Sequence, residues 1–219
     1  MAKPKVLSFT CLALAACGAS GAVHTNLDGV PRCDTIYSAL PHDIAQGRGP
    51  WALGFRSNTS SPFTPYTSFS TSEPGFAGSD GVAWWYAGTA NWPCAAMNTN
   101  SKVISYADIT LQPGQFFLHP GAAGEQSIAR WTAYRAGTVE IRAGFSGISR
   151  APTTTDAHVF LNNARLAEGG INVGGSGNLF TYVGPVDVVV GDTIDLAVGY
   201  GNGDYACDST ALNVSICAL

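Results

Sequence analysis

Charge is scarce in this sequence. Of 219 residues, 11 are Lys or Arg and 15 are Asp or Glu, which gives a formal net charge of −4 at neutral pH. The basic residues form no cluster, so the electrostatic footprint that nucleic-acid binding requires is missing. No apolar run approaches the roughly 20 residues of a membrane-spanning helix. The chain is therefore expected to bind no nucleic acid and to cross no membrane.

Motifs for catalysis and metal binding are also missing. The sequence contains no G-x-S-x-G elbow, no phosphate-binding loop and no metalloprotease helix motif. Its four histidines are scattered, and no C-x-x-C or H-x-x-x-H spacing suggests a zinc site. No catalytic residue is assigned, and no cofactor is expected apart from a structural calcium ion considered below.

The start of the chain is typical of an export signal. Two lysines precede an uncharged apolar run from Val6 to Ala16, and small residues follow. The run ends in Leu-Ala-Ala-Cys, which resembles the lipobox of bacterial lipoproteins and implies that Cys17 is acylated as the first mature residue. Cleavage after a small-x-small triplet, with free secretion, is the alternative. We expect an outer-membrane lipoprotein or a secreted protein, with a signal peptide over 1–16, a tether over 17–34 and a single β-sandwich domain over 35–219.

Cysteine usage fits an oxidising compartment. The signal accounts for Cys11 and Cys17, and four cysteines remain, so two disulfides are the default. Four cysteines allow three pairings, among which sequence alone cannot choose. In a closed β-sandwich the first and last strands often lie side by side, which favours Cys33–Cys217 and leaves Cys94–Cys207.

Short strands joined by turns dominate the pattern. Glycine is abundant, with 26 residues, and turn signals recur every 8–12 residues, as in sandwiches and barrels. Apolar residues alternate with polar ones in the second half, and Asn162-Asn163 is a plausible tight hairpin turn. The prediction is an all-β, two-sheet, jelly-roll-like sandwich of about ten strands. The expected strands include 36–40, 51–56, 82–86, 103–109, 115–119, 139–145, 186–190, 194–198 and 209–217.

Several stretches resemble a known family. They are Leu118–Gly121, Ala129–Ala133, Thr153–Val159, Val190–Asp195 and Asp208–Thr210. Together they resemble a secreted bacterial β-sandwich module that often precedes a PEP-type C-terminal sorting signal, over roughly residues 50–216. The resemblance implies a jelly roll of the carbohydrate-binding-module type without a catalytic assignment. Departures from the pattern are Tyr134-Arg135 in place of a Pro-rich turn and the added cysteines 94, 207 and 217.

Aromatic residues offer the sharpest functional signal. Indole rings stack on the apolar faces of sugars, and adjacent residues in a strand point to opposite faces, so Trp84 and Trp85 cannot both enter the core from one side. We expect a stacking platform with flanking hydrogen-bonding amides, and packing in the core is the alternative. The candidate ligand-binding residues are Trp84, Trp85, Tyr86, Asn91, Trp92 and Asn98.

Three other features have structural and functional interpretations. Asn202, Asp204 and Asp208 offer oxygens for a structural calcium ion, although their spacing matches no calcium-loop signature and Asp208 could instead cap a turn. His119 precedes a Pro-Gly turn, where it is expected to satisfy a turn carbonyl rather than to bind a metal. His158 is expected to pair with Asp156 on a polar face.

These observations favour a non-catalytic extracellular or cell-surface binding module, with carbohydrate as the expected ligand. The alternative is a structural, adhesion or matrix subunit that contacts another surface protein through exposed strand edges. A glycan-active enzyme is a third hypothesis, and two carboxylates converging in a cleft would favour it.

Overall fold

The computed structural model describes residues 33–36, 47–88, 92–174 and 179–219. These residues form sixteen strands in three sheets, and every strand pairing among them is antiparallel. No helix in this part of the chain is both long and apolar enough to cross a membrane. The expected signal peptide, the lipidation site and Asn91 lie outside the described residues.

The larger sheet has eight strands in the order β14-β11-β16-β9-β6-β5-β4, with β1 paired to β16 beside this path. Its strands are β1 (Cys33–Thr35), β4 (Ser68–Ser70), β5 (Val82–Tyr86), β6 (Cys94–Asn98), β9 (Phe116–His119), β11 (Gly137–Gly147), β14 (Leu179–Val188) and β16 (Thr210–Ala218).

The second sheet has six strands in the order β13-β12-β15-β10-β2-β3. Its strands are β2 (Trp51–Arg56), β3 (Thr64–Pro65), β10 (Gln126–Thr132), β12 (Pro152–Leu161), β13 (Ala164–Gly174) and β15 (Thr193–Gly199). From β9 onward the chain crosses repeatedly between the two sheets, which is the jelly-roll-like connectivity that the sequence predicts.

The main core lies between the two large sheets. Along β11 the residues Val139, Ile141, Ala143 and Phe145 are buried while their neighbours are not, so the period-two pattern turns one face inward. Trp51, Trp85 and Trp131 belong to this core. The all-β sandwich is therefore confirmed.

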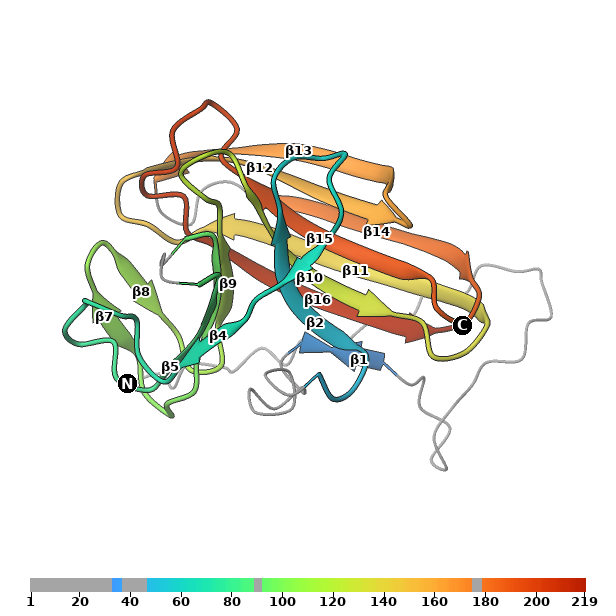
Figure 1. The fold of residues 1–219 in the computed structure, drawn as a ribbon, viewed down its shortest axis with the longest axis horizontal. Helices are drawn as coiled ribbons and strands as arrows, with labels where there is room; N and C mark the ends of the chain where they lie inside the picture. The colour runs from blue at the N-terminus through green and yellow to red at the C-terminus, as the bar shows by residue number, and fades with distance from the viewer. Residues whose placement is uncertain (1–32, 37–46, 89–91, 175–178) are drawn as a thin grey trace, which may run out of the picture.

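A two-stranded hairpin, β7 (Ile104–Tyr106) and β8 (Ile109–Leu111), lies at one end of the molecule beside β5 and β9 (Figure 1). A single strand over 103–109 is the sequence prediction, and it is wrong. The chain reverses at Ala107, whose φ of 45° is left-handed, so the segment folds back on itself.

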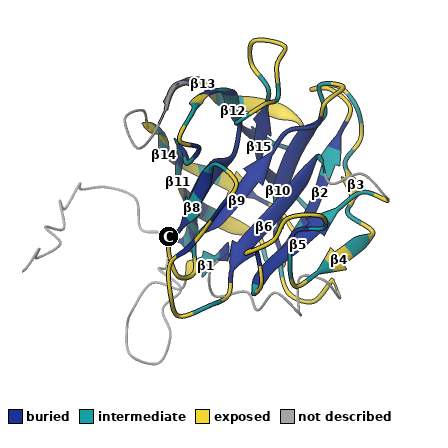
Figure 2. Cartoon of the chain, turned by 90° about the vertical axis from the view of Figure 1, so that its left-hand side faces the viewer, coloured by how far each residue is buried: buried dark blue, intermediate teal, exposed yellow. Residues whose placement is uncertain are grey.

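The hairpin contributes to a second hydrophobic cluster. Residues of β5, β6 and β9 pack there with residues of the hairpin, among them Trp84, Ala96, Phe117 and Ile109. As a result β5, β6 and β9 are buried on both faces over almost their whole length (Figure 2). The fold therefore has a main core and a smaller side core, and the side core contains the candidate site.

Two strands and one hairpin turn agree closely with the sequence prediction. β2 and β5 have the predicted bounds, and Asn162 and Asn163 both have positive φ, 50° and 68°, as the tight β12–β13 hairpin turn requires. The strand count exceeds the predicted ten because several strands have only two or three residues.

Cys33 and Cys217 form the disulfide that the sequence favours, and they face each other in the β1–β16 pairing. Cys33 and Asp34, which the sequence assigns to the end of the tether, lie in β1. Strand pairing to the C-terminal strand and the disulfide together fix this segment to the sandwich.

Candidate functional site

The side core encloses a cavity of about 210 Å³. Its walls come from β5, β9, the β7–β8 hairpin and the loops that precede β5, β6 and β16. This volume is below the range of about 300–1,000 Å³ for drug-sized ligands, so one ring-sized group fits it. We call it the aromatic cavity, and the described residues that line it are Glu73, Phe76, Trp84, Trp92, Tyr106, Ala107, Asp108, Ile109, Phe117, His119, Tyr205, Ala206, Cys207 and Ser209.

Trp92 is the centre of the ring contacts in the aromatic cavity. Its ring centroid lies 5.6 Å from that of His119, 6.0 Å from that of Tyr205 and 6.2 Å from that of Phe76. Phe76 is exposed, and Trp92 and Tyr205 are half-buried, so these three rings surround the mouth.

Trp84 and Phe117 form the floor of the aromatic cavity. Both are fully buried, and their ring centroids lie 5.7 Å apart in an edge-to-face arrangement. The cavity thus has a fixed apolar floor beneath an accessible aromatic mouth.

Three polar atoms of residues that line the aromatic cavity are buried without a hydrogen-bond partner: Nε1 of Trp84, the hydroxyl oxygen of Tyr106 and Oδ2 of Asp108. Leaving such a group unpaired costs about 1–3 kcal/mol. The first can only donate a hydrogen bond, and the carboxylate oxygen can only accept one. A ligand with both an acceptor and a donor would satisfy Trp84 Nε1 and Asp108 Oδ2.

The titratable groups of the aromatic cavity are shifted by burial. Burial raises the pKa of Glu73 to about 7, the nearby Tyr106 hydroxyl opposes this rise, and the Asp108 charge adds to it. Burial lowers the pKa of His119 to about 4, so this ring is neutral at pH 7. Its Nδ1 lies 2.8 Å from the carbonyl oxygen of Pro120 and donates to it, which leaves Nε2 as an acceptor. The expected turn-satisfying role of His119 is confirmed.

The raised pKa of Glu73 predicts a pH-dependent effect of Glu73→Gln. Between pH 4.5 and about 7 the folded state holds the Glu73 proton more tightly than the unfolded state, so stability falls as the pH rises through this window. The glutamine variant lacks this loss. We expect thermal unfolding to give similar melting temperatures for both proteins at pH 4 and a higher one for the variant at pH 8. A difference that does not change with pH would contradict the assignment.

The predicted platform residues do not form one flat strip. Trp84 and Trp85 do point to opposite faces of β5, as expected, but both are buried: Trp84 is in the side core and Trp85 in the main core. Tyr86 is half-buried and packs against the side core. An exposed platform of all three is therefore wrong, because the sheets and the hairpin cover both faces of this strand. Of the predicted ligand-binding residues that the structure describes, Trp84 and Trp92 line the aromatic cavity.

Asn98 has a structural role rather than the expected ligand contact. It is fully buried, and its amide nitrogen donates to the carbonyl oxygens of Lys102, Leu111 and Gln112. Its side-chain oxygen accepts from the backbone of Asn100. The side chain therefore holds the loops around the hairpin in place.

In the acidic loop after β15, the three candidate calcium ligands accept hydrogen bonds from backbone N–H groups. Asn202 and Asp204 each accept a hydrogen bond from the backbone N–H two residues ahead, and Asp208 accepts from the backbone N–H of Thr154. The first two are turn-forming contacts, whereas the Asp208 bond joins the loop before β16 to β12. Within the described residues no group of three or more His, Cys, Asp or Glu side chains is placed to hold a metal ion.

The remaining two cysteines are free thiols in the structure. Cys94 is buried in the side core, and Cys207 is half-buried in the wall of the aromatic cavity. The expected Cys94–Cys207 bridge is not formed. Cys207 has a left-handed φ of 63° in the loop before β16, and Cys94 lies opposite His119 in the β6–β9 pairing.

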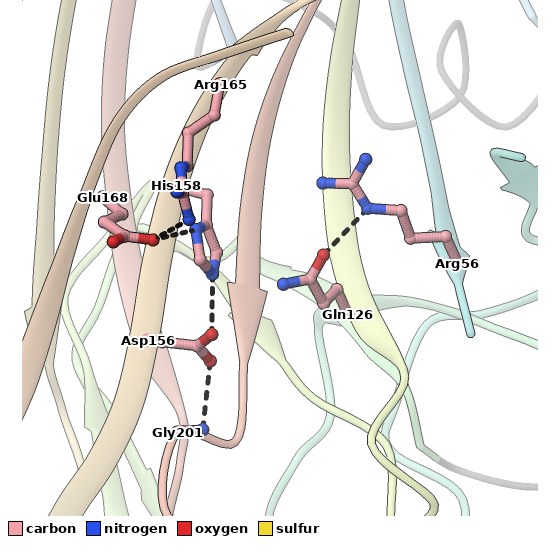
Figure 3. Close-up of polar contacts among 7 residues, drawn as sticks. All are labelled: Arg56, Gln126, Asp156, His158, Arg165, Glu168 and Gly201. Carbon is pink, nitrogen blue, oxygen red and sulfur yellow. Dashed lines mark hydrogen bonds and ion pairs between the residues drawn. The ribbon is translucent and has the colours of Figure 1, made fainter. Parts of the chain in front are cut away.

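A second polar cluster lies on the six-stranded sheet (Figure 3). His158 Nε2 lies 2.6 Å from Asp156, which also accepts from the backbone of Gly201, and the expected His158–Asp156 pair is confirmed. Arg56 is buried, donates to Gln126 and stacks 4.1 Å from the centroid of the Phe160 ring. His158 Nδ1 lies 3.7 Å from a carboxylate oxygen of Glu168, so the ring lies between two acidic side chains.

No known family profile matches the chain, and a search of the curated proteins finds no match. Solved structures that it resembles include a family 51 carbohydrate-binding module from Clostridium perfringens in complex with methyl-galactose, at 14% identity and a TM-score of 0.31 over 47% of this chain and 74% of that one. A native family 35 carbohydrate-binding module from Clostridium thermocellum gives 10% identity and a TM-score of 0.31 over 69% and 88%. Scores this low carry no argument about what the present chain binds.

A further similar structure is part of an enzyme. The β-glucosidase from Kluyveromyces marxianus, in complex with glucose, gives 11% identity and a TM-score of 0.31 over 83% of this chain and 17% of that chain. The likeness again carries no argument about activity. The case for a function therefore depends on the aromatic cavity itself.

Proposed function

We propose that this protein is a non-catalytic carbohydrate-binding module and that the aromatic cavity is its binding site. The observation that carries the proposal is the combination of an accessible aromatic mouth with unpaired polar atoms below it. Sugars are amphipathic in the same way, because a pyranose has apolar C–H faces and a rim of hydroxyl groups. Trp92 would stack on one face of the ring, and hydroxyl groups would pair with Trp84 Nε1 and with Asp108.

The volume of the aromatic cavity limits what enters it. A cavity of about 210 Å³ accommodates a single sugar ring and not a chain segment. The module would therefore bind the end of a glycan or a side branch, with further residues of the glycan outside the mouth. This mode differs from the flat strip that the sequence suggests.

Substituting aromatic residues at the mouth tests whether the aromatic cavity is the binding site. Trp92→Ala and Tyr205→Ala each remove a half-buried ring from the mouth without opening the floor. For hot-spot aromatics the expected loss is about 2 kcal/mol, or roughly thirtyfold in Kd. The measurement is a glycan-array screen of the parent protein, followed by isothermal titration of the strongest hit against both variants.

Tyr134→Ala is the matched control, since Tyr134 is an exposed aromatic in the β10–β11 connection and does not line the aromatic cavity. It should bind like the parent. Equal loss in all three variants, or none in the two rim variants, would remove the aromatic cavity from the account.

One observation favours a second candidate function, hydrolysis of a glycosidic bond. Glu73 and Asp108 both line the aromatic cavity, and the raised pKa of Glu73 keeps a large fraction of it protonated at neutral pH. Glycosidases combine a protonated acid with a second carboxylate. Release of reducing ends from the bound glycan, abolished by Glu73→Gln, would favour hydrolysis, whereas intact glycan after prolonged incubation supports the binding module.

We also propose that the module works outside the cytoplasm, as an outer-membrane lipoprotein anchored through Cys17 or as a secreted protein. The Cys33–Cys217 disulfide supports an oxidising compartment. Metabolic labelling with palmitate and cell fractionation test the anchor. Label in the parent and none in Cys17→Ser supports it, while unlabelled protein in the medium supports free secretion.

A further inference from the structure

The aromatic cavity has carboxylates but no compensating cation. Among its described lining residues there is no Lys or Arg, and His119 is neutral at pH 7. No ion pair joins Glu73 or Asp108 to a basic side chain in the described chain. Arg150 donates to the carbonyl of Ala107 from outside the cavity, but it is exposed, where solvent and salt screen its charge.

The rings of the aromatic cavity are also suited to a cation. Aromatic faces attract a cation within about 6 Å of their centroids, and desolvated pairs contribute the most. Phe76, Trp92, Tyr106 and Tyr205 surround the same space as the two carboxylates. Trp92 is in ring contact with two of the others. An ammonium group in this space would contact the faces of the aromatic rings and the negative charge of the carboxylates Glu73 and Asp108.

We propose that the ligand of the aromatic cavity carries a positively charged nitrogen, as in an amino sugar whose amine is not acetylated. This inference rests on the proposed function and names the class of sugar. A neutral sugar would satisfy the unpaired Asp108 oxygen through a hydroxyl group but would leave the carboxylate charge uncompensated. An ammonium group donates hydrogen bonds and cancels the charge together.

The charge balance also predicts how binding depends on pH. Among the groups that line the aromatic cavity, Glu73 is the one whose pKa is shifted to about 7. Asp208, which lies between the lining residues Cys207 and Ser209, has a pKa that burial raises to about 6. The titratable groups around Glu73 are Tyr106, Asp108, Cys94, His119 and Cys207. Burial raises the pKa values of Tyr106, Cys94 and Cys207. Burial lowers the pKa of His119 to about 4. A bound cation favours ionised Glu73, so affinity for a cation should rise as the pH increases through about 7.

The main test compares three tetramers that share a β-1,4-linked backbone: those of glucosamine, N-acetylglucosamine and glucose. Isothermal titration at pH 7 and physiological salt should give at least tenfold tighter binding of the glucosamine tetramer. The double variant with Glu73→Gln and Asp108→Asn should lose this preference. A matched variant, Asp80→Asn with Asp187→Asn, removes the same charge from two exposed carboxylates away from the aromatic cavity and should keep it.

The outcomes separate the two proposals. Equal binding of all three tetramers by the parent, with loss in Trp92→Ala, would overturn the cationic ligand and leave the carbohydrate site standing. No binding of any tetramer or of any arrayed glycan would overturn the proposed function itself. Loss of the preference in the matched variant would attribute it to general electrostatics and overturn the assignment to Glu73 and Asp108.

A permanently charged probe isolates the contribution of the protein to the pH dependence. Tetramethylammonium does not titrate, so any change in its affinity between pH 6 and 8 arises from the protein. We expect its affinity to rise with pH in the parent and to stay constant in Glu73→Gln. A constant affinity in the parent would contradict the role of Glu73. Tighter binding of tetramethylammonium than of the glucosamine tetramer would replace the amino sugar with a quaternary ammonium ligand.

Discussion

Replacing Trp84 with alanine is expected to lower the free energy of unfolding by about 3–5 kcal/mol, the range for removing a buried aromatic side chain. Trp84 is 1% exposed and packs edge-to-face on Phe117 in the side core. The truncation would enlarge the aromatic cavity from below, and the β-sheet that surrounds it can collapse only in part. Urea unfolding followed by circular dichroism measures the loss.

Trp92→Ala is the natural comparison, because Trp92 borders the same cavity but is half-buried at the mouth. Its expected stability loss is about 1 kcal/mol, typical of a substitution that leaves the core filled. The two substitutions therefore have different main effects: Trp84→Ala mainly lowers stability, and Trp92→Ala mainly weakens binding. Similar losses of stability in the two variants would contradict this division.

Removing the disulfide should have an effect of comparable size. The bond between Cys33 and Cys217 joins residues 184 positions apart, so it excludes many open conformations of the unfolded chain. Loop-closure entropy for a segment of this length corresponds to roughly 5 kcal/mol, and native disulfides typically contribute about 2–5 kcal/mol. We expect the double variant Cys33→Ser with Cys217→Ser to lose stability in this range.

Reductant provides an internal check on the disulfide. Dithiothreitol should destabilise the parent by about as much as the double substitution does, and it should leave the double variant unchanged. Cys207→Ser is the control, since this thiol is free and half-buried. A double variant as stable as the parent would show that the β1–β16 pairing holds the segment without the bond.

Local patterns predicted much of the sandwich. Alternation of apolar residues gave the burial of β11, and the paired asparagines gave the β12–β13 turn. The Cys33–Cys217 bridge followed from the proximity of the first and last strands. Each of these features depends on neighbouring residues or on a general rule of closed sheets.

The aromatic cavity was not predictable in this way. Its walls come from six segments that are distant in sequence, such as those of Glu73, Tyr106 and Tyr205, and nothing in a single segment indicates that they meet. The burial of Trp84 depends on the hairpin, where the sequence predicts one strand, and Trp85 is buried in the main core between the two large sheets. An aromatic pair in a strand therefore indicated the correct region but the wrong surface.

The most direct test of the account is the response of the tryptophan indole N–H signals to sugar. The chain has five tryptophans, of which Trp84 and Trp92 line the aromatic cavity while Trp51, Trp85 and Trp131 belong to the main core. In a nitrogen-15 NMR titration with the three tetramers, a binding tetramer should shift the Trp84 and Trp92 signals and leave the other three in place. Shifts confined to the core tryptophans, or saturable binding with no indole shift, would contradict a carbohydrate site in the aromatic cavity.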